Sequence, residues 1–291
     1  MATLRQINRR IRSVQSTAKT TRAMSLVAGS KMRRAQQMAL AHRPYAEQMD
    51  YLLSDVVEGI RSAVEEGALH PLLERREITT RGLVVMTPDR GLSGGLPTNL
   101  IRRAGQLLIE HPETKIIAVG RKGVDFFRRS RQLLGEFTRL GDYPSYEDAL
   151  PIARLVMDAY TNHEVDSVEI VYPRFINTVL QRPEVMRLLP VTVPEAGETA
   201  IATEYIYEPD AQSVLETLMP RYVEVEVYRA VLEMAASEQS ARMVAMRNAT
   251  DAAQELIEEL TLLRNKVRQE QITKELLDIT GGVEAMTAAA G

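Results

Sequence analysis

The pattern of a coiled-coil helix is clear in residues 246–267, which read MRNATDAAQELIEELTLLRNKV. Apolar residues recur there in alternating steps of three and four, and this spacing places them on one narrow stripe of a helix. The members of the stripe are Met246, Ala249, Ala253, Leu256, Leu260, Leu263 and Val267. A stripe this narrow needs a partner helix to cover it, so we expect the segment to form half of a helix pair.

The helix around this stripe is expected to be unusually long. Neither Gly nor Pro occurs between residues 221 and 280. A helix over this run of 60 residues would measure about 90 Å. The apolar pattern weakens at both flanks, because the same frame puts polar side chains in the stripe. These polar positions are Gln239 and Arg242 on one side, and Glu270 and Lys274 on the other.

A second long helix is expected at the N-terminus. Residues 1–43 contain no Pro and a single Gly, and residues 45–66 again have helical spacing, with Pro44 able to kink the helix between them. Two interpretations remain open: the C-terminal helix pairs with its copy in a homodimer, or the two terminal helices pair within one chain. We favour the intrachain pair, because otherwise both stripes stay uncovered. The N-terminal stripe is Leu4, Ile7, Ile11, Val14 and Ala18.

Composition and charge restrict the class of function. The first 46 residues hold ten Lys and Arg and no Asp or Glu, whereas the other 245 residues carry a net charge of −13. A basic arm of this kind is typical of nucleic-acid binding, of contact with anionic lipid, of a transit peptide, or of docking on an acidic protein. The absence of Cys excludes disulfides, thiolate catalysis and Cys-ligated zinc. No run of 18 apolar residues occurs, so we expect no helix that spans a bilayer.

Between the long helices the sequence alternates between strand and helix patterns. Short links between them predict a mostly parallel sheet with right-handed crossovers and an antiparallel edge. The chain therefore divides into an N-terminal helix (1–70), an α/β domain (71–208) and a C-terminal helix (209–291). We expect strands at residues 82–87, 115–120, 167–172, 178–180 and 185–189, helices at 98–110, 122–131 and 147–163, and a loop at 193–202.

Candidate chemistry in the α/β domain is sparse. The segment Asp89–Gly95 (DRGLSGG) follows the first strand and precedes a helix, where an open α/β sheet would bind a nucleotide. Its glycine spacing fits neither dinucleotide nor phosphate-loop motifs, so a structural turn is the favoured interpretation. The four His residues share no metal-ligand spacing, and no nucleophile elbow occurs. We therefore expect no catalytic, cofactor-binding or metal-binding residue.

Segments along the whole chain resemble the gamma subunit of F-type ATP synthases. The C-terminal segments are the most specific. In the N-terminal helix the matching segments are residues 7–14 (INRRIRSV), 20–24 (TTRAM), 27–32 (VAGSKM) and 42–46 (HRPYA). The α/β domain supplies 89–96 (DRGLSGGL) and 175–178 (FINT), and the C-terminal helix supplies 236–246 (ASEQSARMVAM), 265–269 (NKVRQ) and 272–273 (IT).

This resemblance implies a fold and a function. The implied fold is an antiparallel, left-handed coiled coil of the two terminal helices, with an inserted Rossmann-like α/β domain packed beside it. The implied function is that of a central rotor shaft, which transmits torque between a membrane c-ring and a catalytic hexamer and so couples proton flow to ATP synthesis or hydrolysis. The partners would be the alpha and beta subunits, the epsilon subunit and the c-ring, with no nucleic acid and no cofactor. The protein would be peripheral, on the cytoplasmic face of a bacterial cell membrane.

Two differences from the family's sequences, and the position at which the family motif begins, refine this expectation. Family members often carry Cys where Ser93 stands, and the chain lacks the cysteine-bearing insert of light-regulated chloroplast forms, which argues against thiol regulation. Because the family motif begins within the first ten residues, we expect no leader, and the transit-peptide interpretation of the basic arm falls.

The resemblance also assigns partner contacts, residue by residue. Met24 matches a family position that faces an acidic segment of the beta subunit. Arg242 and Gln269 match contacts with the catch loop of the beta subunit, with Thr273 nearby, and polar residues in the stripe are explained if they face the hexamer. The alternative function is a nucleic-acid-binding or adaptor coiled coil that uses its basic N-terminal helix. A second alternative is an enzyme with a nucleotide at Gly91–Gly95.

Overall fold

The computed structural model describes residues 3–63, 70–129, 133–192, 208 and 210–289. The chain forms two compact units. Residues 1–27 and 245–291 make up the coiled-coil unit, and residues 28–244 make up the α/β unit. Two long helices, α1 (Leu4–Ala63) and α5 (Ala211–Ala289), contribute to both units. The loop expected at 193–202 and the first residue of the segment expected at 209–291 lie outside the described residues.

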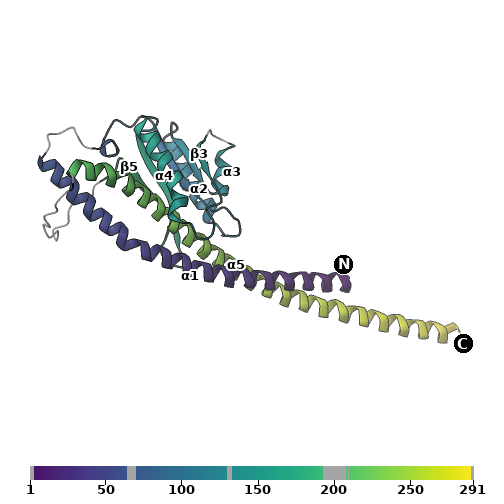
Figure 1. Cartoon of the computed structure of the whole chain (residues 1–291). Coiled ribbons are helices and arrows are strands. Elements are labelled where there is room, and N and C mark those ends of the chain that lie inside the picture. The colour runs from purple at the N-terminus through teal and green to yellow at the C-terminus, as the bar shows by residue number, and fades with distance from the viewer. Residues whose placement is uncertain (1–2, 64–69, 130–132, 193–207, 209, 290–291) are drawn as a thin grey trace. The chain divides into compact units, whose positions relative to one another are not determined.

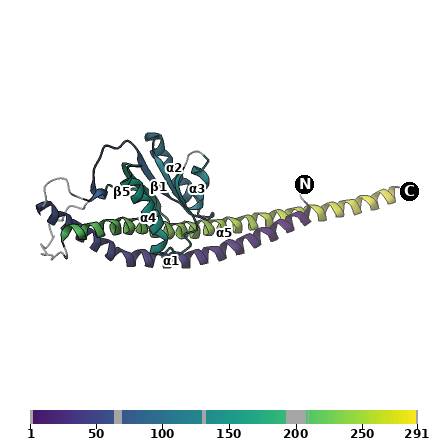
Figure 2. The ribbon, with the colours of Figure 1, turned by 45° about the horizontal axis from the view of Figure 1, so that its top comes forward.

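The coiled-coil unit confirms that the two terminal helices pair within one chain. Ile7 and Ile11 of α1 are buried in one cluster with Leu260 of α5, and the hydroxyls of Thr21 and Thr250 lie 2.7 Å apart. Early residues of α1 contact late residues of α5, so the helices run antiparallel, side by side in both views (Figures 1 and 2). Partly buried side chains complete this seam: Val14, Leu256 and Val267.

One predicted member of the seam is wrong. Leu263 is 44% exposed, whereas Met246, Ala253 and Leu260, spaced by seven, are buried. Positions spaced by seven stay in the seam as far as Val267, so Leu263 lies outside the row of α5 that contacts α1. Beyond residue 267 every described side chain of α5, from 268 to 281, is exposed.

The α/β unit holds a five-stranded mixed sheet in the order β3-β2-β1-β4-β5. The pairs β3–β2, β2–β1 and β1–β4 are parallel. Strand β5 runs antiparallel to β4, which confirms the predicted antiparallel edge. The strands are β1 (Arg81–Met86), β2 (Lys115–Val119), β3 (Leu133–Phe137), β4 (Ser167–Phe175) and β5 (Gln181–Leu189). The helices are η1 (Pro71–Leu73), α2 (Leu96–Glu110), α3 (Arg121–Phe127) and α4 (Tyr146–Thr161).

Two strand predictions differ from the structure. Strand β3 was not predicted, because its sequence LLGEF has a central Gly and a charged residue that break the strand pattern. Gly135 lets the side chain of Leu155 pack closely against β3, since a Cβ atom at that position would lie 2.3 Å from Cδ2 of Leu155. The strand expected at 178–180 is instead part of the turn between β4 and β5, in which Asn177 accepts hydrogen bonds from the amides of Val179 and Leu180.

The sheet buries a separate core on each face. Successive residues of a strand point to opposite faces, so Leu83 and Val85 of β1 pack with α2 and α3, while Val84 and Met86 pack with α4 and the long helices. Figure 2 shows α4 and α5 on the same side of the sheet, away from α2 and α3. Helix α1 continues through Pro44 to Ala63. Its second half contributes Leu53, Val56 and Val57 to this core.

Burial of tyrosines in the α/β unit predicts how its stability depends on alkaline pH. Burial raises the pKa of Tyr172 to about 12, and the charge of Glu184 adds to the shift. Burial also raises the pKa of Tyr222, and the charge of Glu226 adds to that shift. A raised pKa means that the unfolded chain loses its tyrosine protons first. Stability is therefore unaffected below the ordinary tyrosine pKa of 10.0 and falls as the pH rises from there toward 12.

The measurement is an ultraviolet absorbance titration of the chain alongside urea unfolding at each pH. We expect a delayed tyrosinate signal that appears together with unfolding. Replacing Tyr172 with Phe should flatten the decline of stability. If Tyr172→Phe keeps the full alkaline slope, burial of this phenol is not its cause.

Candidate functional site

The carboxyl edge of the sheet is the place to search for a ligand site, because open α/β sheets bind ligands there. Strands β1 and β4 are parallel neighbours, so their carboxyl ends share this edge. Side chains of α5 fill it. Ser237 Oγ donates a hydrogen bond of 2.9 Å to the carbonyl of Pro173, and Ser240 Oγ donates one of 2.8 Å to the carbonyl of Thr178.

Arg242 makes the third contact of α5 with this edge. Its Nη2 atom lies 3.4 Å from the carbonyl oxygen of Gly91, within the DRGLSGG turn that follows β1. Ser93 of the same turn is 1% exposed, and Ala241 packs into the core beneath α2. Side chains of α5 thus occupy the sheet edge where a nucleotide could bind. This favours the interpretation that the turn is structural.

The Arg242 guanidinium contacts neighbouring side chains of α5. It pairs with Glu238 at 2.5 Å, one turn earlier on α5, and donates to Oε1 of Gln239 at 3.1 Å. Its side chain is 10% exposed and that of Glu238 is 8% exposed. Burial raises the pKa of Glu238, an effect that the adjacent Arg242 opposes. Of the polar residues in the stripe of α5, Gln239 and Arg242 are therefore explained by contacts with the α/β domain.

Asp142, in the loop between β3 and α4, is the shared partner in a charged cluster close to these contacts of α5. Its Oδ2 lies 2.7 Å from Nζ of Lys31 on α1 and 3.7 Å from Nη1 of Arg90. Its Oδ1 accepts a 3.1 Å hydrogen bond from Gln239 of α5. One carboxylate thus contacts both long helices and the turn after β1. Sequence reasoning missed it, because no local pattern signals a pair separated by 111 residues.

The four residues assigned by resemblance do not form one cluster. Met24 is half-buried on α1 within the coiled-coil unit. Gln269 and Thr273 are exposed on α5 in the same unit, and their spacing of four places them on one face of the helix. Arg242 belongs to the α/β unit. Their roles as partner contacts stay predictions.

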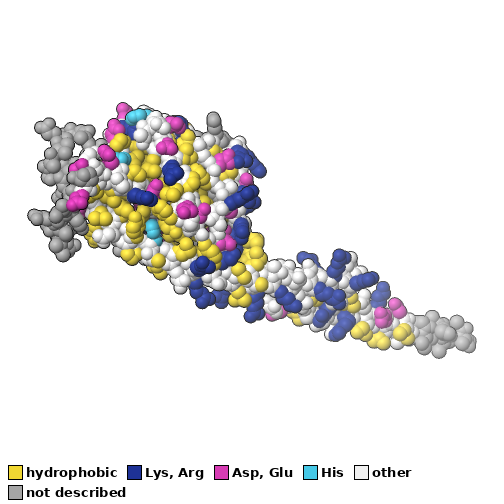
Figure 3. All heavy atoms as spheres, in the orientation of Figure 1, with side chains coloured by type: hydrophobic (Ala, Val, Ile, Leu, Met, Phe, Trp, Pro, Cys, Tyr) yellow, Lys and Arg dark blue, Asp and Glu magenta, His cyan; other side chains and the backbone are white. Residues whose placement is uncertain are grey.

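The coiled-coil unit presents a basic surface. Figure 3 shows Lys and Arg side chains gathered along this stretch. A groove of about 550 Å³ crosses the two helices close to Met24, with Arg22, Arg247 and Asp251 among its lining residues. The exposed basic side chains of α1 in this unit are Arg5, Arg9, Arg10, Arg12, Lys19 and Arg22.

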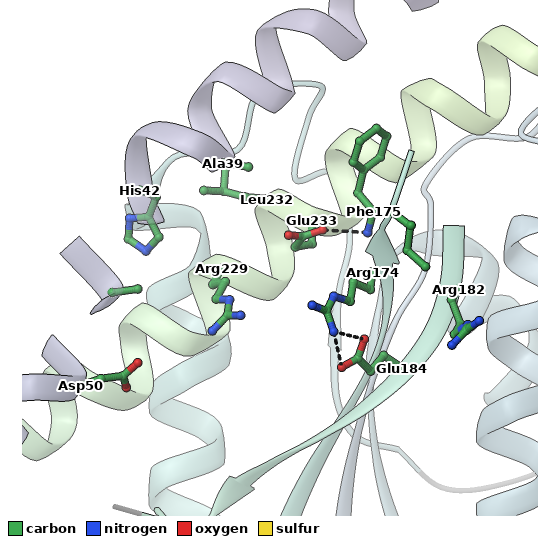
Figure 4. A pocket seen from close by; sticks show the side chains of 12 residues that line it. Ala39, His42, Asp50, Arg174, Phe175, Arg182, Glu184, Arg229, Leu232 and Glu233 are labelled. Atoms are coloured by element: carbon green, nitrogen blue, oxygen red, sulfur yellow. Dashed lines mark hydrogen bonds and ion pairs between the residues drawn. The ribbon is translucent and has the colours of Figure 1, made fainter. Parts of the chain in front are cut away.

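A cavity of about 630 Å³ lies in the α/β unit between α1, α5 and the β4–β5 hairpin (Figure 4). Among its charged groups, Arg174 pairs with Glu184 at 3.3 Å, and Glu233 accepts the backbone amide of Phe175 at 2.8 Å. Burial lowers the pKa of His42 on its wall; a backbone hydrogen bond with Val225 opposes this shift, and the charge of Arg229 adds to it. The described residues of the lining include no Ser, Thr, Cys or Lys that could act as a nucleophile beside His42.

In the part of the chain that the structure describes, no three His, Asp or Glu side chains gather closely enough to hold a metal ion. None of the described helices combines the length and the apolar character needed to cross a bilayer.

Comparison with known proteins identifies the family. The sequence profile of the ATP synthase family ATP-synt matches residues 3–286. An ATP synthase gamma chain of Dehalococcoides mccartyi is 52% identical over 98% of this chain and 100% of its own length. The chain belongs to the ATP synthase gamma-chain family. A gamma chain of Roseiflexus castenholzii is 47% identical over 98% of this chain and 99% of its own length.

Solved structures share the fold of this gamma-chain family member. A chain in the central stalk and c-ring structure of the Tetrahymena thermophila mitochondrial ATP synthase has a TM-score of 0.59 and 24% identity, over 79% of this chain and 99% of that one. A chain of the Euglena gracilis mitochondrial enzyme has a TM-score of 0.56 and 20% identity, over 90% and 97%. None of these relatives supports the alternative of a nucleic-acid-binding coiled coil.

Proposed function

We propose that the chain is the central-stalk rotor of an F-type ATP synthase and has no catalytic site of its own. The observation that carries this proposal is the antiparallel pairing of α1 and α5 in the coiled-coil unit of a gamma-chain family member. Two helices wound together resist twisting better than one, because each restrains the bending of the other. Such a pair can transmit torque.

Surface properties of the long helices support rotation inside a sleeve of other subunits. Residues 1–44 and 229–291 contain no Phe, Tyr or Trp, so few bulky side chains project from them. The basic side chains of α1 in the coiled-coil unit face water, where ion pairs with a partner are weak and screened by salt. Contacts of this strength can form and break at each step of a rotation.

The proposed assembly assigns a partner to each part of the chain. The coiled-coil unit would turn inside a hexamer of alpha and beta subunits, with Met24, Gln269 and Thr273 in contact with beta subunits. Arg242, in the α/β unit, would be a further contact with a beta subunit. The α/β unit would connect to the epsilon subunit and to the membrane c-ring. The chain would then reside at the cytoplasmic face of a bacterial cell membrane without crossing it.

Reconstitution tests this function. The chain is mixed with alpha and beta subunits, and the complex is added to membrane vesicles that contain the proton-conducting sector. We expect the chain to co-purify with the hexamer and to restore ATP-driven proton transport. A hexamer that assembles and pumps equally well without the chain would refute the proposal.

Gln269 offers a test of one partner contact. Its side chain is exposed on a part of α5 where every described side chain is exposed, so Gln269→Ala should leave the melting temperature of the free chain unchanged. In the reconstituted complex the same variant should lower ATP turnover by about tenfold, equivalent to the loss of one hydrogen-bonded contact of roughly 1.4 kcal/mol.

A matched control for this variant lies two positions along the helix. Gln271 is also exposed, and a separation of two residues turns it to another face of α5. Gln271→Ala should keep wild-type turnover. Equal turnover in the two variants would remove Gln269 from the contact surface.

A further inference from the structure

We infer that Asp142 is a positioning residue of the rotor, which fastens the α/β domain to both long helices so that they turn as one body. This inference rests on the proposed function. Asp142 accepts contacts from Lys31 of α1 and Gln239 of α5 at the same carboxylate. No other role is needed for these groups, since they line neither the groove of the coiled-coil unit nor the cavity of the α/β unit.

Hydrogen bonds fix the loop that carries Asp142 to the rest of the α/β unit. Its loop between β3 and α4 is anchored by Asp89, whose Oδ2 accepts the backbone amide of Arg139 at 2.8 Å. The other oxygen of Asp89 accepts the amide of Arg121, the first residue of α3, at 2.9 Å. A force on the Asp142 carboxylate is therefore passed to the loop and to α3.

The charge of Asp142 is secured by its surroundings. Burial opposes ionisation of this carboxyl, but the hydrogen bond and charge of Lys31, together with Arg90 and Arg242, outweigh it and lower the pKa. The side chain is 21% exposed and that of Lys31 is 29% exposed, so water only partly screens the pair. At neutral pH the contact is a charge-assisted hydrogen bond.

Directional contacts matter at this position because the apolar contacts around it are not directional. Burial of apolar surface holds the sheet against the helices but depends little on small sliding movements. A short charge-assisted hydrogen bond weakens steeply when its atoms are displaced. Lys31 lies about one helical turn from residue 27, where the α/β unit ends on α1. The contact therefore resists slippage where torque would leave the α/β unit.

The absence of native Cys permits a direct test. Lys31 and Asp142 are both replaced by Cys, which removes the two charges together, and the variant is assembled in the full complex. We expect the ratio of protons transported to ATP hydrolysed to fall, because part of each rotation would be lost as slippage between the α/β domain and the long helices. Joining the two cysteines with a short bis-maleimide should restore the ratio, because it replaces the lost contact with a covalent one.

The control pair is Arg128 and Glu136, another ion pair within the α/β domain, which joins the C-terminal cap of α3 to β3 and includes no residue of a long helix. Arg128→Cys with Glu136→Cys should keep the wild-type ratio, with or without the cross-linker. Wild-type coupling in the uncross-linked Lys31/Asp142 variant, or no recovery on cross-linking, would overturn the role of Asp142.

Two further comparisons keep the test decisive. Failure of the wild-type chain to support proton transport would count against the proposed function itself, independently of Asp142. Should the double-cysteine variant not fold, Asp142→Asn provides the same comparison, because it keeps the shape of the side chain and removes its charge. A melting temperature near that of the wild type with a lowered ratio supports the inference, and an unchanged ratio refutes it.

Discussion

Gly120→Ala is expected to prevent the α/β unit from folding stably. Gly120 lies at the end of β2 with a φ of +86°, and a Cβ atom there would lie 1.7 Å from the carbonyl oxygen of Thr87. That oxygen belongs to the buried backbone directly after the central strand β1, which is hydrogen-bonded to β2 through Val119, so neither side can move away cheaply. We expect a loss of roughly 4 kcal/mol or more in the free energy of unfolding, the range reserved for severe steric conflict.

Gly141 provides the matched control for this substitution. It also has a positive φ, of +80°, but no atom lies within 4 Å of the position where its Cβ would be. Gly141→Ala should therefore cost only the backbone strain of about 1–2 kcal/mol. Urea unfolding of the two variants gives the comparison. Similar losses in both would show that strain, and not the clash with Thr87, determines the cost at Gly120.

Leu260→Asp is expected to separate the two helices of the coiled-coil unit. Leu260 is 7% exposed and packs in one cluster with Ile7 and Ile11. An aspartate there would place an unpaired charge between apolar side chains, at a cost of about 3 kcal/mol. We expect a lower melting temperature for the coiled-coil unit of the chain and weaker assembly with the hexamer.

Leu262 is the control, two residues along the same helix and 71% exposed. Leu262→Asp should change stability by less than about 0.5 kcal/mol, as surface substitutions usually do. Circular dichroism melts and size-exclusion chromatography with the hexamer compare the two variants. Unchanged melting and assembly of Leu260→Asp would refute the position of the seam.

The helix pair was predictable from sequence because its signal is local and repeated. Steps of three and four in α5, with a matching stripe in α1, indicated the pairing, and the contact of Leu260 with Ile7 confirms it. The frame was wrong at Leu263, which is exposed although Leu260 before it and Val267 after it pack in the seam. Strand β3 escaped prediction because its packing depends on Gly135 fitting against Leu155, a long-range contact.

The joint between α5 and the sheet was only partly predictable. The sequence marked Gln239 and Arg242 as polar residues in an apolar stripe, but gave no indication of what they contact. Arg242 donates to the Gly91 carbonyl and Gln239 to Asp142, and each contact joins residues that lie far apart in the chain. Such pairs form only once the α/β domain has folded beside the helix, so no spacing rule detects them.

Direct observation of rotation tests the central claim. Ile109 on α2 is 81% exposed, and in a chain without native Cys an Ile109→Cys variant accepts a single bead through a thiol-reactive biotin. The hexamer of the assembled complex is fixed to a surface and ATP is added. We expect the bead to turn steadily in one direction for as long as ATP is hydrolysed. A bead that stays fixed while hydrolysis continues at the normal rate would contradict this claim.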